Sequence, residues 1–360
     1  MGAAMGRSSG ILPCQAIESL IETGAIAADR EISPEQVQPA SLDLRLGERA
    51  FRVRASFLPG PGAAMAARLE RLSMHEIDLS QGAVLERGCV YVVEIAERLD
   101  LPPKISGRAN PKSSIGRLDV FVRLICEGAD AFDRARPGYE GRLWLEIAPQ
   151  TFAILVRAGD RLAQMRFRQG PQGPVEVRDV RVGLGAGPDG EPCGFRARRH
   201  AGVIDLARNG GHDPAQFFEA LSAPGGELLL DPGEFYILAS REGVEVGPEE
   251  AAEMSPIDPA VGEFRAHYAG FFDPGFGLAS GGQGLAPEGV PGGAPGGAKA
   301  VLEVRSREAP FLLEDGQIVA RLAYEPLIEP PSRLYGQGNA GGHYQSQALA
   351  LSRFFAPWPV

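Results

Sequence analysis

The sequence predicts an all-β protein with a few short helices, built from two tandem copies of one antiparallel sandwich or barrel domain. Two observations predict this fold class: short strand-like segments recur at close intervals, and a set of segments in the first half returns in the same order in the second. The composition agrees, because Gly (47) and Pro (30) are abundant and aromatic residues make up only 7% of the 360 residues. Many turns joining short strands are typical of β-sandwiches and barrels.

The internal repeat is clearest in two pairs of segments. Residues 85–93 (LERGCVYVV) return as residues 230–238 (LDPGEFYIL), and residues 144–147 (WLEI) return as residues 301–304 (VLEV). In each half, the Glu of the second segment is followed 13 residues later by a turn glycine and then by an apolar run. Self-similarity of this kind indicates two copies of one structural unit.

The predicted elements of the first half begin with a helix over residues 14–25. Ile17, Leu20 and Ile21 share one face of it, and Gly24 can end it. Alternating or continuous apolar runs between turn residues then predict strands. These lie at 42–46, 51–54, 76–79, 89–95, 104–108, 118–125, 142–148, 152–157 and 161–168.

The boundaries follow from where this pattern stops and resumes. We predict a first domain at 1–170, an irregular Gly-, Pro- and Arg-rich linker at 171–200 and a second domain at 201–360. A helix over 213–222 with Asp213 as its N-cap opens the second domain. Strands are expected after it at 226–230, 234–239, 263–272, 300–306, 310–314 and 317–325.

Charge and cysteine usage restrict the function classes. The net charge of −10 argues against an extended nucleic-acid surface, which needs a basic patch, but a few local cations can still hold a small anion. No apolar run has the length of a membrane span, so no membrane partner is expected. Cys14, Cys89, Cys126 and Cys193 form no C-x-x-C pair and are expected to be reduced packing residues of a cytoplasmic protein.

Polar side chains that carry chemistry gather in residues 107–118 (GRANPKSSIGRL). Lys112, Ser113 and Ser114 follow a proline that can begin a turn, so they offer an ammonium group, two hydroxyls and backbone N–H groups to an anion. Taken alone, the same string is also compatible with a solvated turn.

Glu146 is the second candidate. It lies in an apolar strand that returns from the turn 137–141 (PGYEG). A carboxylate in such a run either pairs with an arginine or serves as an acid/base group whose pKa is raised by desolvation.

Taken together in their order, these motifs resemble the trimeric dUTPase/dCTP deaminase superfamily, and within it dCTP deaminase in a tandem-domain form. The resemblance covers most of 10–170 and, more loosely, 200–355. The matching segments are 41–47 (SLDLRLG), 112–118 (KSSIGRL), 137–141 with Leu145 and Glu146, and a closing tail made of Tyr335 and 343–347 (HYQSQ).

The resemblance implies two dUTPase-like β-clip or jelly-roll barrel domains and the hydrolytic deamination of dCTP to dUTP and ammonia. It assigns Glu146 as the base that takes a proton from water and passes it to the ring and the leaving amine. It assigns Ser113 and Arg117 to hold the water and the ring region. No zinc is expected, because the sequence lacks the His or Cys and P-C-x-x-C ligands of zinc deaminases.

The resemblance also implies how the nucleotide is held. Mg²⁺ is expected on the triphosphate itself rather than on a protein site, dTTP is a possible inhibitor, and three chains are expected to form a homotrimer with six domains. The residues expected to bind the nucleotide are Lys112, Ser114, Arg134, Tyr335, His343 and Gln347.

The two copies differ in ways that leave alternatives open. The hairpin of the first half reads Arg136-Pro137-Gly138, where the family usually has Asp-Pro-Gly, whereas the second half keeps Asp273 and the possible equivalent Glu303 but has no Lys-Ser-Ser string. One hypothesis combines the turn and Glu146 of the first domain with the tail of the second. The other treats the second domain as a structural copy whose Glu303 is a relic.

Two other functions remain open from the sequence. One is a dUTP diphosphatase, or an enzyme that performs both reactions, which would need an Asp-held water at the hairpin. The other is a nucleotide-binding protein without catalysis, in which Glu146 only pairs with Arg117.

Overall fold

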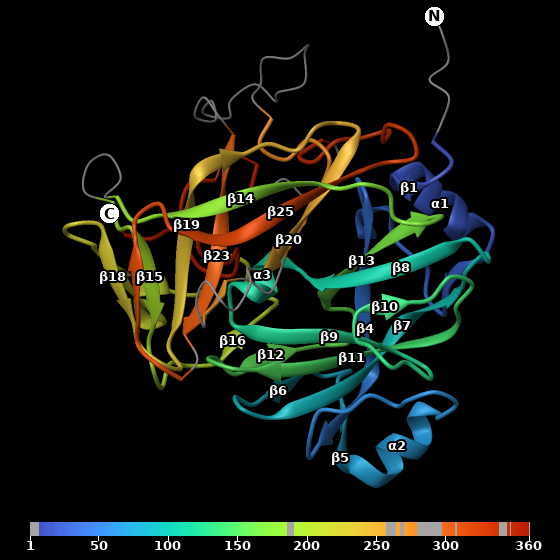
Figure 1. Ribbon diagram of the computed structural model, residues 1–360. Helices are drawn as coiled ribbons and strands as arrows, with labels where there is room; N and C mark the ends of the chain where they lie inside the picture. The colour runs from blue at the N-terminus through green and yellow to red at the C-terminus, as the bar shows by residue number, and fades with distance from the viewer. Residues whose placement is uncertain are drawn as a thin grey trace, which may run out of the picture.

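The computed structural model describes residues 7–185, 191–256, 264–266, 270–278, 297–306, 308–337, 344–345 and 347–359. Figure 1 shows two β-rich halves side by side, the first in blue and green and the second in yellow to red. The predicted all-β class with few, short helices is confirmed.

The first half is organised around one large sheet with the strand order β10-β8-β13-β4-β7-β11-β9. The predicted first helix is confirmed, as α1 (Cys14–Glu22), and Gly24 after it has the positive φ of 80° that ends a helix readily. The other elements are β1 (Gly10–Ile11), β2 (Ile26–Ala28), η1 (Pro34–Gln36), β3 (Val37–Gln38), β4 (Ser41–Val53), α2 (Met65–Leu72), β5 (Ser73–Asp78), β6 (Ala83–Leu85), β7 (Val90–Asp100), β8 (Ile105–Pro111), α3 (Ser113–Gly116), β9 (Val120–Cys126), β10 (Arg134–Ala135), β11 (Glu140–Pro149), β12 (Ile154–Val156) and β13 (Arg161–Gln169).

The second half has a corresponding sheet with the order β17-β15-β19-β14-β25-β20-β22, to which β23 adds through β19. Its elements are β14 (Glu176–Gly183), β15 (Gly194–Ala197), β16 (Ile204–Asp205), η3 (Pro214–Gln216), β17 (Phe218–Leu221), β18 (Glu227–Leu230), β19 (Phe235–Val244), β20 (Glu250–Pro256), β21 (Phe264–Ala266), β22 (Phe271–Phe272), β23 (Ala298–Ser306), β24 (Phe311–Glu314) and β25 (Ile318–Pro326).

Equivalent strand pairs recur in the two halves, as the sequence repeat predicts. β7 pairs with β11 as β19 pairs with β23, and β8 pairs with β13 as β20 pairs with β25. β4 lies between β7 and β13, and β14 likewise lies between β19 and β25. β14 is therefore the second copy of β4, and the two share a sequence pattern: residues 42–47 read LDLRLG and residues 178–183 read RDVRVG.

Two predictions about the start of the second half are wrong. The expected linker 171–200 carries β14 and β15, both of which belong to the second sheet. The expected helix 213–222 is only the single turn Pro214–Gln216, with Asp213 capping Ala215 N–H, followed by a strand. Phe217 and Phe218 at this point are buried, and their packing outweighs the local helix signals.

The two halves share their apolar core. The core cluster of the first half also contains Phe217, Phe218 and Phe235 of the second half and Phe354 and Phe355 of the C-terminal tail. β16 adds in parallel to β12 of the first half. This packing fixes the halves against each other, and so it fixes the geometry of any site between them.

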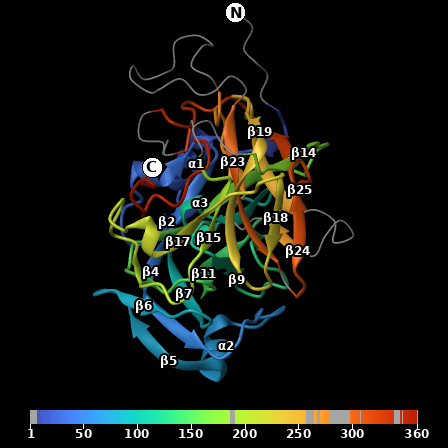
Figure 2. The same cartoon turned by 90° about the vertical axis from the view of Figure 1, so that its left-hand side faces the viewer.

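Three further observations concern the placement of the helices, membrane-spanning segments and the cysteines. Figures 1 and 2 show α2 and β5 projecting from the end of the first half, whereas α3 lies between the halves. Among the described residues, no helix has the length and apolar character required to cross a membrane. The four cysteines are unpaired.

Candidate active site

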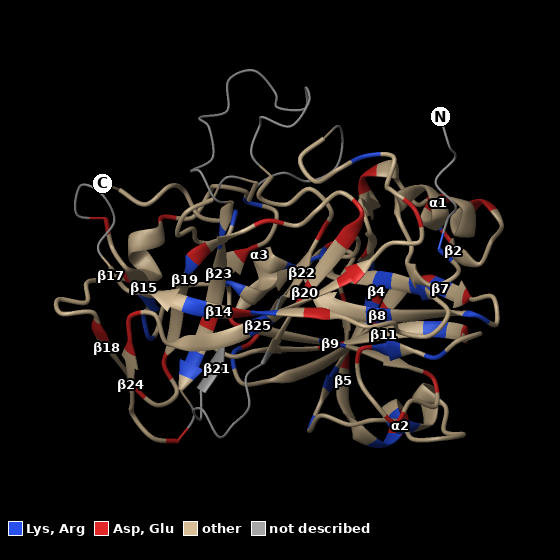
Figure 3. Cartoon of the chain, turned by 45° about the horizontal axis from the view of Figure 1, so that its top comes forward, with Lys and Arg blue, Asp and Glu red and all other residues tan. Residues whose placement is uncertain are grey.

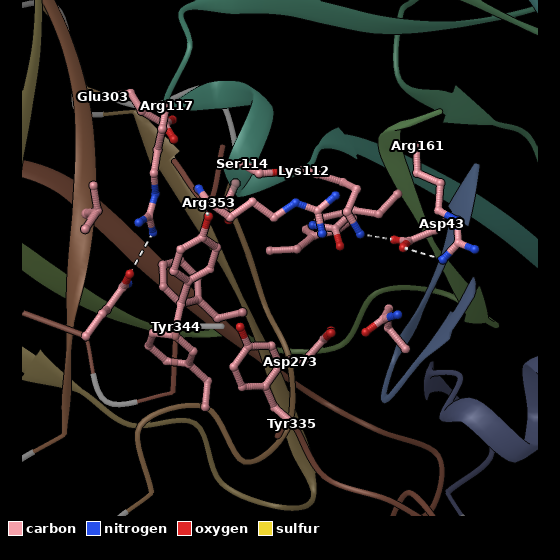
Figure 4. A pocket seen from close by; sticks show the side chains of 18 of the residues that line it. Asp43, Lys112, Ser114, Arg117, Arg161, Asp273, Glu303, Tyr335, Tyr344 and Arg353 are labelled. Atoms are coloured by element: carbon pink, nitrogen blue, oxygen red, sulfur yellow. Dashed lines mark hydrogen bonds and ion pairs between the residues drawn. The ribbon is translucent and has the colours of Figure 1, made fainter. Parts of the chain in front are cut away.

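A cavity of about 290 Å³ lies between the two halves, and both contribute to its lining. The first half supplies the turn that contains α3, together with side chains of β4 and β13. The second half supplies β22, β23 and the C-terminal tail. Figure 4 shows Glu303 and Arg117 at one end of the cavity and Lys112, Asp43 and Arg161 at the other.

The cationic end of the cavity is organised by Asp43. Asp43 is buried on β4, and its carboxylate receives Lys112 Nζ at 2.5 Å and lies 3.9 Å from Arg161 Nη1. Glu35 also lies 3.9 Å from Arg161, so two cations and two carboxylates meet here, and the N–H groups of Lys112 and Arg161 are the donors that an anionic ligand could use. Lys112 immediately precedes α3, so the predicted polar turn does line a cavity.

Arg117 follows α3 and is held by the tail of the second half. Its side chain is buried and donates to Gln347 Oε1 at 2.8 Å and to the Ala350 carbonyl at 3.0 Å. The guanidinium also lies 3.9 Å from the ring centre of Tyr344, within the range of a cation–π contact. Gln347 donates in turn to the Lys299 carbonyl at 2.8 Å, which ties the tail to β23.

Glu303 lies on β23 and its side chain meets α3 directly. It is only 2% exposed. A Cβ atom added to Gly116 would lie 2.6 Å from Glu303 Oε1 and 2.8 Å from Oε2. A carboxylate of the second half therefore packs on the polar turn of the first, and it can do so because residue 116 has no side chain.

Glu146 occupies the corresponding position on β11, but it does not line this cavity. Its carboxylate is hydrogen-bonded by the Ser56 hydroxyl and the Phe57 backbone N–H, both from the segment that leads into α2. Burial raises the pKa of Glu146, and Oε2 has no hydrogen-bond partner in the described part of the chain. The structure thus separates Glu146 from Ser113 and Arg117, with which the sequence grouped it.

The other predicted site residues divide into three groups. Ser113, Ser114 and Tyr335 line the cavity with Lys112, Arg117 and Gln347. Arg134 lines a different cavity. His343 lies outside the described residues.

The prediction missed several residues that the structure brings to the cavity, of which Asp273 is the most informative. Asp273 is buried, lines the cavity and accepts a hydrogen bond from Arg166 Nη2 at 3.2 Å. Burial raises the pKa of Asp273, while the charge of Arg166 opposes the shift. Its Asp-Pro-Gly hairpin was visible in the sequence, and only its contact with the first half was not. Arg161 and Arg353 are further lining residues that were not predicted, and Tyr344 lies in the predicted tail segment 343–347 but was given no role there.

The described residues contain no group of three or more His, Cys, Asp and Glu side chains arranged to hold a metal ion. The chemistry of the cavity residues themselves is that of a buried carboxylate, hydroxyls and fixed cations. Such a set can move protons and hold phosphates.

Sequence comparisons agree with this division into two copies. The family model for the N-terminal domain of 2'-deoxycytidine 5'-triphosphate deaminase matches residues 8–171, and that for the C-terminal domain matches residues 167–355. The chain belongs to the dCTP deaminase family. The boundary between the two matches falls before β14, in agreement with the pairing of that strand.

Individual relatives are similar over different lengths. A dCTP deaminase of Shewanella amazonensis is 29% identical over 168 residues, which are 44% of this chain and 82% of the relative. One of Pectobacterium atrosepticum is 31% identical over 137 residues, 36% of this chain and 68% of the relative. The crystal structure of 2'-deoxycytidine 5'-triphosphate deaminase from Agrobacterium tumefaciens is 49% identical, superposes with a TM-score of 0.82, and is matched over 89% of this chain and 100% of its own.

Proposed function

We propose that the chain deaminates dCTP to dUTP and ammonia in the cavity between its halves, with Glu303 as the general base. The observation that carries this proposal is the contact of the Glu303 carboxylate with Gly116, in the turn that also bears Ser113 and Arg117. The same arrangement makes Glu303, rather than Glu146, the partner of the polar turn.

The proposed reaction needs one carboxylate that accepts and then returns a proton. Glu303 takes a proton from water, and the hydroxide attacks C4 of the cytosine ring. The protonated carboxyl group delivers this proton to N3. Glu303 then takes the remaining proton of the C4 hydroxyl and passes it to the amine, so that the C–N bond breaks, NH3 leaves and the carbonyl of uracil forms. The enclosed position of Glu303, 2% exposed, keeps bulk water from competing for these protons.

Ser113 and Arg117 are proposed to hold the water and the ring. Ser113 supplies a hydroxyl that can both donate and accept. Arg117 supplies a fixed positive charge, since its guanidinium is already held by Gln347 and Tyr344 of the tail. A charge fixed before substrate arrives stabilises developing negative charge without reorganisation.

The nucleotide is proposed to lie along the cavity with its base at Glu303 and its phosphates towards Lys112 and Ser114. Asp273, between the two ends in Figure 4, can accept a hydrogen bond from a sugar hydroxyl, since Arg166 uses only one of its acceptor positions. Tyr335 and Gln347 of the tail close the cavity.

We propose that Mg²⁺ enters with the nucleotide, since Mg²⁺ in such sites is bound mainly by substrate phosphates and water. Lys112, paired with Asp43, would face those phosphates. None of the proton transfers above passes through the ion.

The position of Asp273 also favours a second candidate activity. A dUTP diphosphatase, or an enzyme performing both steps, needs a carboxylate that activates water beside the α-phosphorus, and Asp273 is a buried carboxylate of the cavity. Product analysis distinguishes the two, because the diphosphatase releases pyrophosphate and the deaminase releases ammonia.

The experiment is to incubate the purified chain with dCTP and Mg²⁺ and to measure ammonia, dUTP and pyrophosphate. Glu303→Gln should lower the turnover number by about 10²–10⁴-fold, the range for loss of a general base. Glu146→Gln is the matched control and should retain turnover. The proposal fails if Glu146→Gln abolishes ammonia release while Glu303→Gln retains it.

We also propose that the chain forms a homotrimer, that dTTP inhibits it and that it is located in the cytoplasm. Four unpaired cysteines suit a reducing compartment. Sedimentation of the purified chain tests the assembly, and dTTP titration of the deamination assay tests the inhibition.

A further inference from the structure

Four arginines share one face at the edge of the first sheet, and a fifth, Arg136, lies beside them. Across β10, β8 and β13, Arg134 lies opposite Arg108, and Arg108 lies opposite Arg166. Arg168 is two residues beyond Arg166 on β13 and so points to the same face, and Arg136 directly follows β10 and lines the same cavity. Figure 3 shows the basic positions gathered on β8 and the strands beside it.

Two of these arginines have no carboxylate partner. Among the described residues, Arg134 and Arg136 make no ion pair, and both are exposed. The pKa of Arg168 is lowered, first by burial and then by the positive charges of Arg108 and Arg166. The other three are paired with the second half: Arg108 with Glu253 at 2.9 Å, Arg166 with Asp273 at 3.2 Å, and Arg168 with Glu325.

The arginine face is concave. It forms one wall of a cavity of about 580 Å³, to which both halves contribute and which is separate from the proposed active site. Four carboxylates also line it: Glu253 and Glu325 pair with Arg108 and Arg168, Glu127 accepts a hydrogen bond from the Met65 backbone N–H at 2.8 Å, and Asp130 lies beside Glu127 in the same loop. Among the described residues, Arg134 and Arg136 are the arginines of this cavity that make no ion pair.

We propose that this second cavity binds a di- or triphosphate group, with Arg134 and Arg136 as its principal contacts. Two guanidinium groups without an ion pair, one on β10 and one directly after it, offer forked donors that match phosphate oxygens. Arg108 and Arg168 stand beside them and add positive potential. A concave, cation-lined surface of this size can enclose such a group, whereas a flat patch cannot.

Two residues, Phe271 and Arg166, link the second cavity to the first. Phe271 lines both cavities. Arg166 lines the second and donates to Asp273 in the first, and its guanidinium lies 4.1 Å from the Phe271 ring centre. An anion bound in the second cavity would attract the Arg166 guanidinium. Because Arg166 donates to Asp273, this attraction would also affect the carboxylate proposed to hold the sugar.

The test is to count polyphosphate sites on the full chain by isothermal titration calorimetry at low ionic strength, with inorganic tripolyphosphate as the probe. Wild type should bind two per chain. The double variant Arg134→Gln/Arg136→Gln should lose one site, and Lys112→Gln should weaken the other, so that the two variants lose different sites. Both changes are on exposed or half-buried side chains, and thermal melting checks that the variants fold.

A single site per chain in wild type, or two undiminished sites in the double variant, would overturn the proposal. If the double variant instead changes the sedimenting mass and keeps both sites, the arginine face is a contact between chains and the proposal is also overturned. Repeating the titration of Lys112→Gln with dCTP identifies the source of the phosphate. Tighter binding than tripolyphosphate indicates a nucleotide, and equal binding indicates that the phosphates alone are recognised.

Discussion

Gly116 and Glu303 share a space that has room for only one side chain. Replacing Gly116 with Ala would put a methyl group 2.6 Å from Glu303 Oε1, so the carboxylate has to move. Displacement of a general base by even about 1 Å can cost about 10²-fold in rate. The substitution should therefore reduce turnover more than stability, because the atoms it displaces lie at the end of the flexible Glu303 side chain.

We therefore predict that Gly116→Ala lowers the turnover number for dCTP by at least about 10-fold and changes Tm little. Gly173→Ala is the matched control, since a Cβ there meets nothing within 4 Å. Steady-state kinetics and thermal melting of both variants check the prediction. Unchanged turnover in Gly116→Ala would contradict the role given to this contact.

The second residue-scale prediction concerns pH. Burial raises the pKa of Glu146 above its ordinary value of 4.5. Above pH 4.5 the folded state therefore holds this proton more firmly than the unfolded state, and wild type loses stability as the pH rises towards the folded pKa. Glu146→Gln lacks this dependence.

We expect the difference in Tm between Glu146→Gln and wild type to grow in favour of the variant as pH rises from acid to neutral. Each kcal/mol should shift Tm by about 2–4 °C or less in a chain of this size. Thermal melting at a series of pH values measures it. A difference that is constant with pH, or that shrinks, would show that the Glu146 carboxyl is not desolvated.

Single residues also show where sequence analysis stops. The polar turn at Lys112 and the tail residue Gln347 could be predicted because each lies in a motif of adjacent residues. The choice between Glu146 and Glu303 could not, because both lie in the same apolar pattern and differ only in what packs on them. Gly116 meets one of them, and Ser56 meets the other.

At the scale of elements, the segment 54–72 with α2 distinguishes the surroundings of Glu146 from those of Glu303. It covers the outer face of β11, where Trp144 packs with Met65 and Leu69 of α2. On the second copy, α3 and Gly116 of the first approach the corresponding strand. The repeat predicted equivalent strands, but it carried no information about this insertion, and α2 was not predicted.

The C-terminal tail is the second decisive element. Phe354 is 2% exposed and inserts into the core of the first half, and Ser352 Oγ donates to the Ser114 carbonyl at 2.7 Å. The tail therefore belongs structurally to both halves, and its packing positions the residues that hold Arg117.

We predict that Phe354→Ala destabilises the chain by about 3–5 kcal/mol, the usual result of truncating a buried aromatic side chain. It should also weaken the hold on Arg117 and raise KM for dCTP. Urea unfolding and steady-state kinetics test both effects. Leu312→Ala, at a position that is 49% exposed, is the control and should change neither.

At the scale of the whole molecule, the proposed site is assembled within one chain. Ser113 comes from the first copy and Glu303 from the second, and the packing that joins them is intramolecular. The sequence predicted two copies and their order of strands. The strand β14 was assigned to a linker because its sequence has few apolar residues in an alternating pattern, and only Val180 and Val182 of it are buried.

An intramolecular site makes a prediction about mixtures. Ser113→Ala and Glu303→Gln chains should each be nearly inactive, and co-expressing or co-refolding them should not restore deamination, because no chain then carries both residues. Recovery of a substantial fraction of wild-type activity in the mixture would mean that the working site lies between chains. Mixtures of wild type with either variant are the control, because they show how measured activity depends on the fraction of active chains.

The joining of two copies in one polypeptide has a consequence for engineering. In an assembly of identical subunits, every substitution is repeated around the ring, so a change that improves one wall of a pocket also alters the same residue wherever else it occurs. Here the wall that bears Lys112 and the wall that bears Glu303 are encoded separately, and a designer can retune substrate preference on one without disturbing the other.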